Sequence, residues 1–147
     1  MAEDFSDGGP VCVMLGDNCT DANIKKEVEA FADGGFVFLK RVPDPQRFGV
    51  AEFDKDGNVV GIEEKPEKPK SNYAITAPYI YDYSVFEKIK KLKPSGRGEL
   101  EITDVNNLYL KEGKLKCGKL RGFWRDAGTF RTLFEVNKYW ANKAQRT

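Results

Sequence analysis

The feature that most constrains this chain is a continuous apolar run from Val11 to Leu15, which ends at Gly16 and is followed at once by Asp17. A run without polar alternation is typical of a strand that is covered on both faces of a mostly parallel sheet. In open α/β sheets, ligands gather outside the carboxyl ends of such strands. Asp17 is therefore a candidate metal ligand. The simpler alternative is that the residues from Gly16 to Asn18 form only a turn, or that Asp17 caps a helix.

The amino-acid composition excludes several kinds of chemistry. The 147 residues contain no histidine, which rules out His-dependent triads, histidine metal sites and histidine proton shuttles. The net charge is +1, so no global field favours nucleic acid or a membrane as partner, and no apolar run approaches the roughly 18 residues that a membrane-spanning helix needs. The scattered residues Cys12, Cys19 and Cys117 indicate reduced thiols in a cytoplasmic protein. Chemistry here must use carboxylates, Lys, Arg, backbone amides and a metal.

The rest of the pattern alternates strands with helices. Strands are expected over residues 36–42, 50–53, 59–64, 73–81, 115–120 and 123–124, and helices near Thr20, Ser84, Thr103 and Thr129. The pair Asp56-Gly57 predicts a hairpin turn between the second and third of these strands. The fold class predicted is α/β, with a mixed sheet flanked by helices in a single domain over residues 1–147.

Several local features give the predicted elements more detail. Pro78 places its strand at a sheet edge or at a bulge. Ser84 and Glu87 match a capping box at a helix start. The first helix is expected to be capped by Thr20 or Asp21, with apolar positions at 24, 28 and 31. The last helix carries apolar positions at 130, 133, 134 and 140 on one side.

Three further places in the sequence suggest chemistry. Asp126 follows aromatic strand residues and precedes a glycine and a helix start, as Asp17 follows its strand, so the two acids could hold one Mg²⁺ through oxygen. Each is also a plausible turn or helix-start acid. Glu64 and Lys65 end a strand and could present an acceptor and a cation to a phosphorylated ligand, or simply be a solvated strand end. Gly49 could let a backbone amide approach a ligand, or begin a plain strand.

Taken together, seven stretches in order resemble the sugar-1-phosphate nucleotidylyltransferases, most closely those of the glucose-1-phosphate thymidylyltransferase type. They are L-G-D-N at 15–18, D-P-Q-R-F-G-V at 44–50, I-E-E-K-P at 62–66, K-S-N-Y-A-I-T at 70–76, Y-I-Y-D at 79–82, R-G-E-L-E-I-T-D-V-N at 97–106 and W-R-D-A-G-T at 124–129. Their order and spacing agree over nearly the whole chain, which makes the resemblance far more specific than any single motif.

The resemblance implies a Rossmann-like nucleotidyltransferase fold and a role for each matching position. Asp17 and Asp126 correspond to a Mg²⁺ pair, and Lys65 to a catalytic lysine that grips the sugar phosphate. Glu64 corresponds to a residue that binds sugar hydroxyls, Gly49 to a backbone donor to the sugar, and Ile75 and Tyr79 to the pocket lining. The implied reaction joins glucose 1-phosphate to dTTP or UTP and releases pyrophosphate; it needs positioning and charge neutralisation, with little need for a protein base.

The sequence also departs from the family pattern. The Gly-rich loop with Arg and Lys that cradles the triphosphate is not found, because Gly8-Gly9 is followed by Pro10 and lacks basic residues. We therefore expect a truncated fold that supplies the sugar-phosphate and Mg²⁺ half, is inactive alone, and binds a nucleoside triphosphate only if the missing N-terminal part is supplied. The alternative is a non-catalytic sugar-phosphate-binding or protein-interaction module. An exposed sheet edge near Val11 predicts a homodimer, and Ala77-Pro78 replaces a usual glycine near Tyr79.

Overall fold

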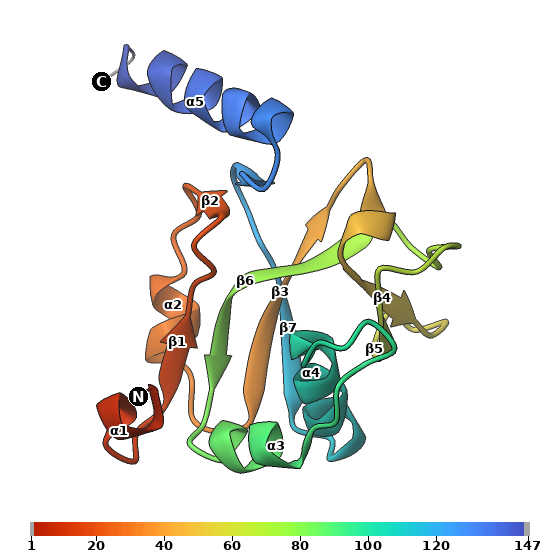
Figure 1. Ribbon diagram of the computed structural model, residues 1–147. Helices are drawn as coiled ribbons and strands as arrows, with labels where there is room; N and C mark the ends of the chain where they lie inside the picture. Colours follow the sequence, from red (N-terminus) through yellow and green to blue (C-terminus); the bar gives the residue numbers. More distant parts are fainter. Residues whose placement is uncertain (1, 146–147) are drawn as a thin grey trace.

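A mixed six-stranded sheet organises the computed structural model, which describes residues 2–145. Its strands are β1 (Val11–Val13), β3 (Gly35–Arg41), β4 (Gly49–Phe53), β5 (Val59–Glu64), β6 (Tyr73–Tyr81) and β7 (Leu115–Lys119). They run in the order β5-β4-β6-β3-β7, with β1 paired to β6 (Figure 1). Only the β3–β7 pair is parallel among these described strands. The predicted mixed sheet is confirmed, although it is mostly antiparallel.

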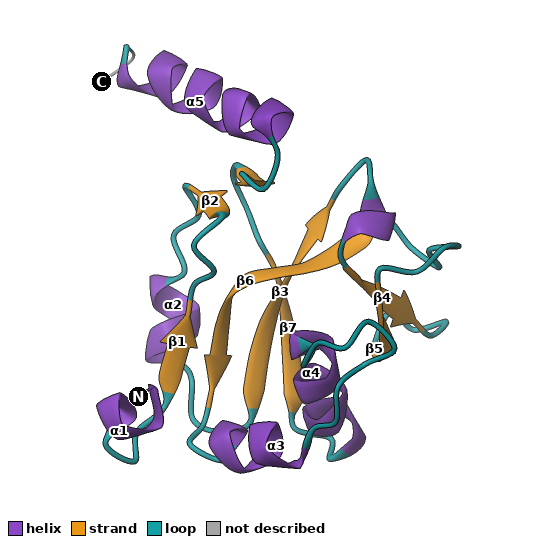
Figure 2. Ribbon diagram, in the orientation of Figure 1, coloured by secondary structure: helices purple, strands orange, loops and turns teal. Residues whose placement is uncertain are grey.

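Helices flank this sheet, and a second, two-stranded sheet stands above it (Figure 2). The helices are α1 (Ala2–Ser6), α2 (Lys25–Glu29), the short 3-10 helix η1 (Pro45–Arg47), α3 (Val85–Lys91), α4 (Ile102–Lys111) and α5 (Phe130–Ala144); the second sheet pairs β2 (Asn18–Thr20) with β8 (Trp124–Asp126). No helix within residues 2–145 is long and apolar enough to cross a membrane. The helix α5 leads away from the main sheet (Figure 1).

The core has two parts because neighbouring residues of a strand point to opposite faces of a sheet. Val37 and Leu39 of β3 face the helices α3 and α4, where they pack with Val85 and Tyr109. Phe38, between them, belongs to a second cluster on the other face. That cluster contains Phe38, Val42, Ala74, Ile80, Leu120 and Trp124. Both faces of the central strands are therefore covered.

The run from Val11 to Leu15 does not form the buried, parallel strand that its sequence indicates. Only Val11–Val13 is a strand, and it lies antiparallel to residues 79–81 of β6. No described strand pairs with its outer edge, and Met14 and Leu15 are 46% and 39% exposed. The prediction of a parallel strand covered on both faces is wrong, whereas the open sheet edge expected near Val11 is present, because β1 pairs only with β6 among the described strands.

The strand β6 shows how a proline is accommodated inside a sheet. Its pairing with β3 shifts register, because Val37 lies opposite Tyr79 whereas Phe38 lies opposite Thr76. Ala77 and Pro78 are the two residues passed over, so the predicted bulge is confirmed. The alternative prediction of an edge is wrong, because β6 pairs with β3 on one side and with β1 and β4 on the other.

The predicted capping box at Ser84 and the predicted caps Thr20 and Asp21 are wrong, because groups outside these helices bind the side chains. Ser84 makes no capping hydrogen bond and instead donates its hydroxyl to Asp82 at 2.5 Å. The helix α2 begins only at Lys25, and its N-cap residue is Ile24, so neither Thr20 nor Asp21 caps it. Thr129 does cap α5: its hydroxyl accepts from the backbone N–H of Thr132, whose own hydroxyl accepts from Thr129 N–H.

Asp21 instead anchors the C-terminal helix α5. Its carboxylate accepts hydrogen bonds from the Lys143 ammonium at 2.7 Å, from the Tyr139 hydroxyl, and from the Phe123 backbone N–H at 2.7 Å. The contacts with Lys143 and then Tyr139 lower the pKa of Asp21 to about 2. The aromatic rings of Phe123 and Tyr139 also stack, with centroids 3.8 Å apart. The carboxylate thus ties the first and last thirds of the chain together.

The apolar side chains of α5 do not form the buried face that their spacing suggested. Phe130 and Phe134 are 95% and 67% exposed, and Leu133 and Trp140 are also exposed. The buried residues of this helix are Thr132 and Val136. Only the face bearing these two side chains is covered by the described chain, because α5 contacts β8 and then extends beyond the main sheet (Figure 1).

Close packing between β4 and the start of α4 gives a testable prediction. A Cβ atom on Gly49 would lie 2.7 Å from Thr103 Oγ1 and 3.3 Å from Glu64 Oε2. We expect Gly49→Ala to lower the free energy of unfolding by about 1–3 kcal/mol, as overpacking does, measured by urea denaturation. Gly61→Ala on the paired strand is the control, because its nearest neighbour would be Glu52 Oε2 at 3.4 Å. Equal stability of the two variants would contradict this packing.

Candidate active site

One cavity of about 320 Å³ collects all the residues that the sequence singled out as a candidate site. It is formed where β4, β5 and β6 of the main sheet meet the β2–β8 ribbon and the start of α4. Its lining includes Asp17, Gly49, Glu64, Lys65, Ile75, Tyr79 and Asp126. These seven residues are thus assembled around one space, although they come from five separate segments of the chain.

The two acidic residues meet because β2 and β8 pair antiparallel. Asn18 lies directly opposite Asp126 in this ribbon, and Asp17 occupies the turn just before it, closed by a hydrogen bond from Asn18 N–H to the Leu15 carbonyl. A Cβ atom placed on Gly128 would lie 3.3 Å from Asp126 Oδ2 and 3.5 Å from Asp17 Oδ2. The two carboxylates therefore face the same space. Asp17 therefore lies in a turn, as the simpler interpretation of residues 16–18 predicted, and it also lies beside Asp126.

The surroundings of Asp126 suit a bound cation. The residue is only 5% exposed, and its Oδ1 is buried without a hydrogen-bond partner among residues 2–145. Buried polar atoms without a partner are rare and often mark the site of an ion or water. Within the described chain no three acidic, cysteine or histidine residues cluster as a metal site. A pair of carboxylates nevertheless fits Mg²⁺, which commonly takes one or two carboxylates and completes its shell with water and substrate phosphate.

Glu64 and Lys65 lie at the end of β5, across the cavity. Glu64 Oε2 accepts a hydrogen bond of 2.5 Å from the hydroxyl of Thr103, and its Oε1 is 3.8 Å from the Arg97 guanidinium. Lys65 is exposed and has a φ of +43°, which is uncommon for a residue with a side chain. Its backbone N–H is held by the Phe48 carbonyl at 3.0 Å. Such held, strained residues cluster at functional sites.

Ile75 and Tyr79 line the cavity from β6. Both side chains are buried, with exposed fractions of 6% and 4%. Burial raises the pKa of Tyr79, and the negative charges of Glu64 and Asp17 raise it further. Tyr79 is thus a neutral part of the cavity wall at neutral pH.

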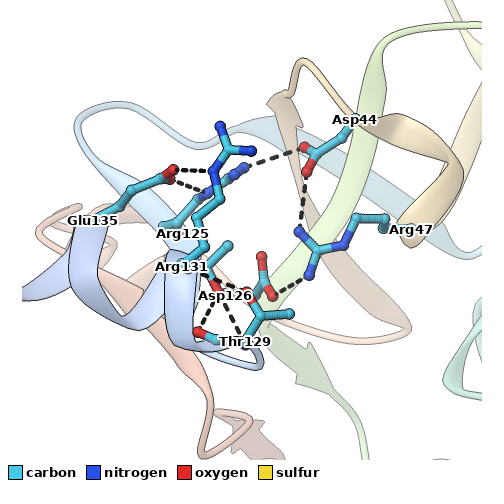
Figure 3. A network of polar contacts seen from close by, with 8 residues as sticks. Asp44, Arg47, Arg125, Asp126, Thr129, Arg131 and Glu135 are labelled. Carbon is cyan, nitrogen blue, oxygen red and sulfur yellow. Dashed lines mark hydrogen bonds and ion pairs between the residues drawn. The ribbon is translucent and has the colours of Figure 1, made fainter.

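A polar network beside the cavity was not recognised from the sequence as part of the site (Figure 3). Arg47 donates from Nη2 to Asp126 Oδ2 at 2.7 Å and from Nη1 to Asp44 Oδ2 at 3.0 Å. Arg125 bridges Asp44, at 3.2 Å, and Glu135 of α5, at 2.9 Å. Burial alone would raise the pKa of Asp44, but the contacts with Arg47 and Arg125 lower it overall.

The sequence did contain a signal for part of this network. Asp44 and Arg47 belong to the D-P-Q-R-F-G-V stretch, in which the family resemblance gives a role only to Gly49. Thr103, which holds Glu64, lies in another of the matching stretches and carried no chemical signal of its own.

Curated proteins of known name are similar to this chain over most of its length. A glucose-1-phosphate thymidylyltransferase of Neisseria gonorrhoeae is 46% identical over 145 residues, which cover 95% of this chain and 50% of that protein. The low-salt glycan biosynthesis nucleotidyltransferase Agl11 of Haloferax volcanii is 37% identical over 141 residues, covering 93% of this chain and 40% of that protein. The chain thus spans about half the length of the curated relatives that it matches.

Solved structures share the fold. A crystal structure of a Bacillus anthracis protein, provisionally named as a glucose-1-phosphate thymidylyltransferase and bound to sucrose, has a TM-score of 0.86 and 48% identity over 94% of this chain and 57% of that one. UDP-glucose pyrophosphorylase complexed with UDP-glucose has a TM-score of 0.82 at 20% identity, covering 97% of this chain and 60% of that one, and supports the fold alone. Residues 1–143 also match the Nucleotidyl transferase family model, and the chain therefore belongs to the nucleotidyl transferase family.

Proposed function

We propose that this cavity binds a sugar 1-phosphate, most simply glucose 1-phosphate, together with Mg²⁺. The bound sugar phosphate is the acceptor in a nucleotidyl transfer that gives a nucleotide-sugar and pyrophosphate. The observation that carries the proposal is that one cavity contains both a carboxylate pair and a phosphate-binding pair. The carboxylates are those of Asp17 and Asp126. Glu64 provides a hydrogen-bond acceptor and Lys65 provides a cation. The names of the relatives, glucose-1-phosphate thymidylyltransferases, support the choice of sugar and of dTTP as donor, with UTP as the second candidate.

Each lining group has a role that its chemistry suits. Glu64, held by Thr103, accepts hydrogen bonds from sugar hydroxyls, and the exposed ammonium of Lys65 pairs with the sugar phosphate. Gly49 brings backbone close to the sugar, because a side chain there would collide with Thr103. The buried side chains of Ile75 and Tyr79 form the cavity wall. These groups place the phosphate for attack without acting as a base, which is consistent with a chain that lacks histidine.

The metal and the nucleotide complete the proposal. Asp17 and Asp126 are the residues that would hold Mg²⁺, and the ion when bound neutralises phosphate charge. The nucleoside triphosphate needs a Gly-rich loop with Arg and Lys, which these 147 residues do not contain. We therefore assign to this chain the sugar-phosphate and metal side of the transfer.

The proposed compartment is the cytoplasm. Cys12, Cys19 and Cys117 are all free cysteines in the described chain, as is usual where glutathione keeps thiols reduced.

Replacing the proposed phosphate ligand tests the sugar-phosphate site. We expect Lys65→Ala to weaken binding of glucose 1-phosphate by roughly 1.5–3 kcal/mol, the usual value of a hydrogen bond to a charged group, measured by isothermal titration calorimetry. Lys68→Ala is the control, because Lys68 is also exposed but does not line the cavity. The same affinity in the Lys65 variant and the parent would exclude this role.

The carboxylate pair is tested with Mn²⁺, which can be followed by electron paramagnetic resonance. We expect Asp17→Asn to weaken Mn²⁺ binding by on the order of tenfold or more, because one of only two anionic ligands is lost. Asp56→Asn removes the same charge from an exposed hairpin turn and should leave binding unchanged. Full Mn²⁺ affinity in the Asp17 variant would show that the pair holds no metal.

We also propose that the protein forms a homodimer through the free edge of β1. Unpaired strand edges invite pairing with another chain, and Met14 beside this edge is 46% exposed. Light scattering over a concentration series should show a dimer for the parent and a monomer for Met14→Lys, because a charge blunts the edge. Val60→Lys, at an exposed apolar position of β5, should remain dimeric. A parent that stays monomeric at every concentration would refute the dimer.

A further inference from the structure

Arg47 lines the cavity and binds one of the two carboxylates that are proposed to hold a divalent cation. The oxygens of Asp126 and Asp17 that lie on the same side, next to Gly128, are the two Oδ2 atoms. Asp126 Oδ2 is also the atom that accepts from Arg47 Nη2, at 2.7 Å. The Asp17 Oδ1 atom accepts from the Asn18 side chain at 2.8 Å. A divalent cation held by Asp17 and Asp126 would therefore lie next to a guanidinium that already binds the Asp126 carboxylate.

Asp126 needs such a counter-charge when no metal is bound. Its side chain is only 8% exposed, and a buried carboxylate without a cation partner is strongly unfavourable. A guanidinium is always charged, so Arg47 provides the compensating charge at every accessible pH. With Mg²⁺ bound, the same guanidinium would place a second positive charge against the ion, which is electrostatically unfavourable.

A second carboxylate gives Arg47 a place to remain when it releases Asp126. Arg47 Nη1 binds Asp44 Oδ2 at 3.0 Å, and Asp44 is itself fixed by Arg125, which Glu135 of α5 holds (Figure 3). Arg47 also lies over the ring of Phe48, with its guanidinium carbon 5.3 Å from the ring centroid. The guanidinium can therefore give up one partner and still stay beside the cavity.

We propose that Arg47 is an internal counter-cation that competes with a divalent metal for the Asp126 carboxylate. In the metal-free protein it neutralises Asp126, and with a metal bound it would release this carboxylate while Asp44 keeps it beside the cavity. The affinity of the site for metal is then set by this competition as well as by the two carboxylates. This inference rests on the metal site of the proposed function.

Removing the competing charge provides the test. We expect Arg47→Met to bind Mn²⁺ about tenfold more tightly than the parent, because a charge-assisted hydrogen bond no longer has to break, measured by electron paramagnetic resonance or calorimetry. Arg131→Met is the matched control: it makes the same change in charge at a side chain that is 86% exposed, forms an ion pair with Glu135 and does not line the cavity. Its Mn²⁺ affinity should equal that of the parent.

A stability measurement separates competition from a merely structural role. Without metal, Arg47→Met should melt at a lower temperature than the parent, because Asp126 is left unpaired, and Mg²⁺ should raise its melting temperature by more than it raises that of the parent. If Arg47→Met does not fold without metal, the parent protein is studied by NMR instead. The side-chain ¹⁵N signals of Arg47 should shift when Mg²⁺ is added. Unchanged signals at saturating metal would overturn the inference.

The outcomes distinguish this inference from the proposed metal site. Equal or weaker Mn²⁺ binding by Arg47→Met, with a parent that binds through Asp17, overturns the competition and leaves the metal site standing. Absence of Mn²⁺ binding in the parent and in Arg47→Met removes both. Both are supported if Arg47→Met binds Mn²⁺ more tightly than the parent and if adding Asp17→Asn to this variant abolishes the binding. Arg47→Lys, which keeps a positive charge, should bind no more tightly than the parent, and tight binding there would show that charge is not what competes.

Discussion

The pairing of β2 with β8 is the constraint on which the site depends. It joins a segment near residue 18 to a segment near residue 126, and it is reinforced by the bond from the Thr20 hydroxyl to the Phe123 carbonyl at 2.7 Å and from Ala127 N–H to the Asp17 carbonyl at 2.6 Å. This short ribbon brings Asp17 beside Asp126 and also begins the path to α5. Loss of the ribbon would separate the carboxylates and release the helix together.

Charge is distributed around the cavity so that each carboxylate has a nearby cation or donor. Glu64 has Thr103 and Arg97, while Asp126 has Arg47. The Arg47–Asp126 pair is unequal: the arginine side chain is 33% exposed and the aspartate 8%. Its formation therefore contributes modestly, as partly exposed pairs do, whereas removing only the cation leaves a buried charge at a larger cost. Such an asymmetry suits an oxygen that exchanges one cation for another.

Local signals predicted elements well where the partner of a residue was also local. The Asp56-Gly57 turn follows from the backbone needs of a hairpin, with Gly57 at a φ of +84°, and the α5 cap joins Thr129 to Thr132 only three residues away. Asp and Ser are residue types that often cap helices, yet Asp21 and Ser84 do not cap one. Asp21 instead accepts from the distant Lys143, and Ser84 donates to the neighbouring Asp82. A sequence pattern cannot weigh such competing partners, because their distances are set by the fold.

The sequence by itself determined the class of fold, the family resemblance and seven of the residues that line the cavity, because buried strands, turn residues and the order of motifs are encoded locally. Only the tertiary structure decided that these residues share one cavity, that Val11–Val13 pairs antiparallel with β6, and that Arg47 binds Asp126 across 79 positions of the chain. The physical reason is that contacts between distant segments depend on strand pairing and helix packing, which fix distances that no local pattern carries.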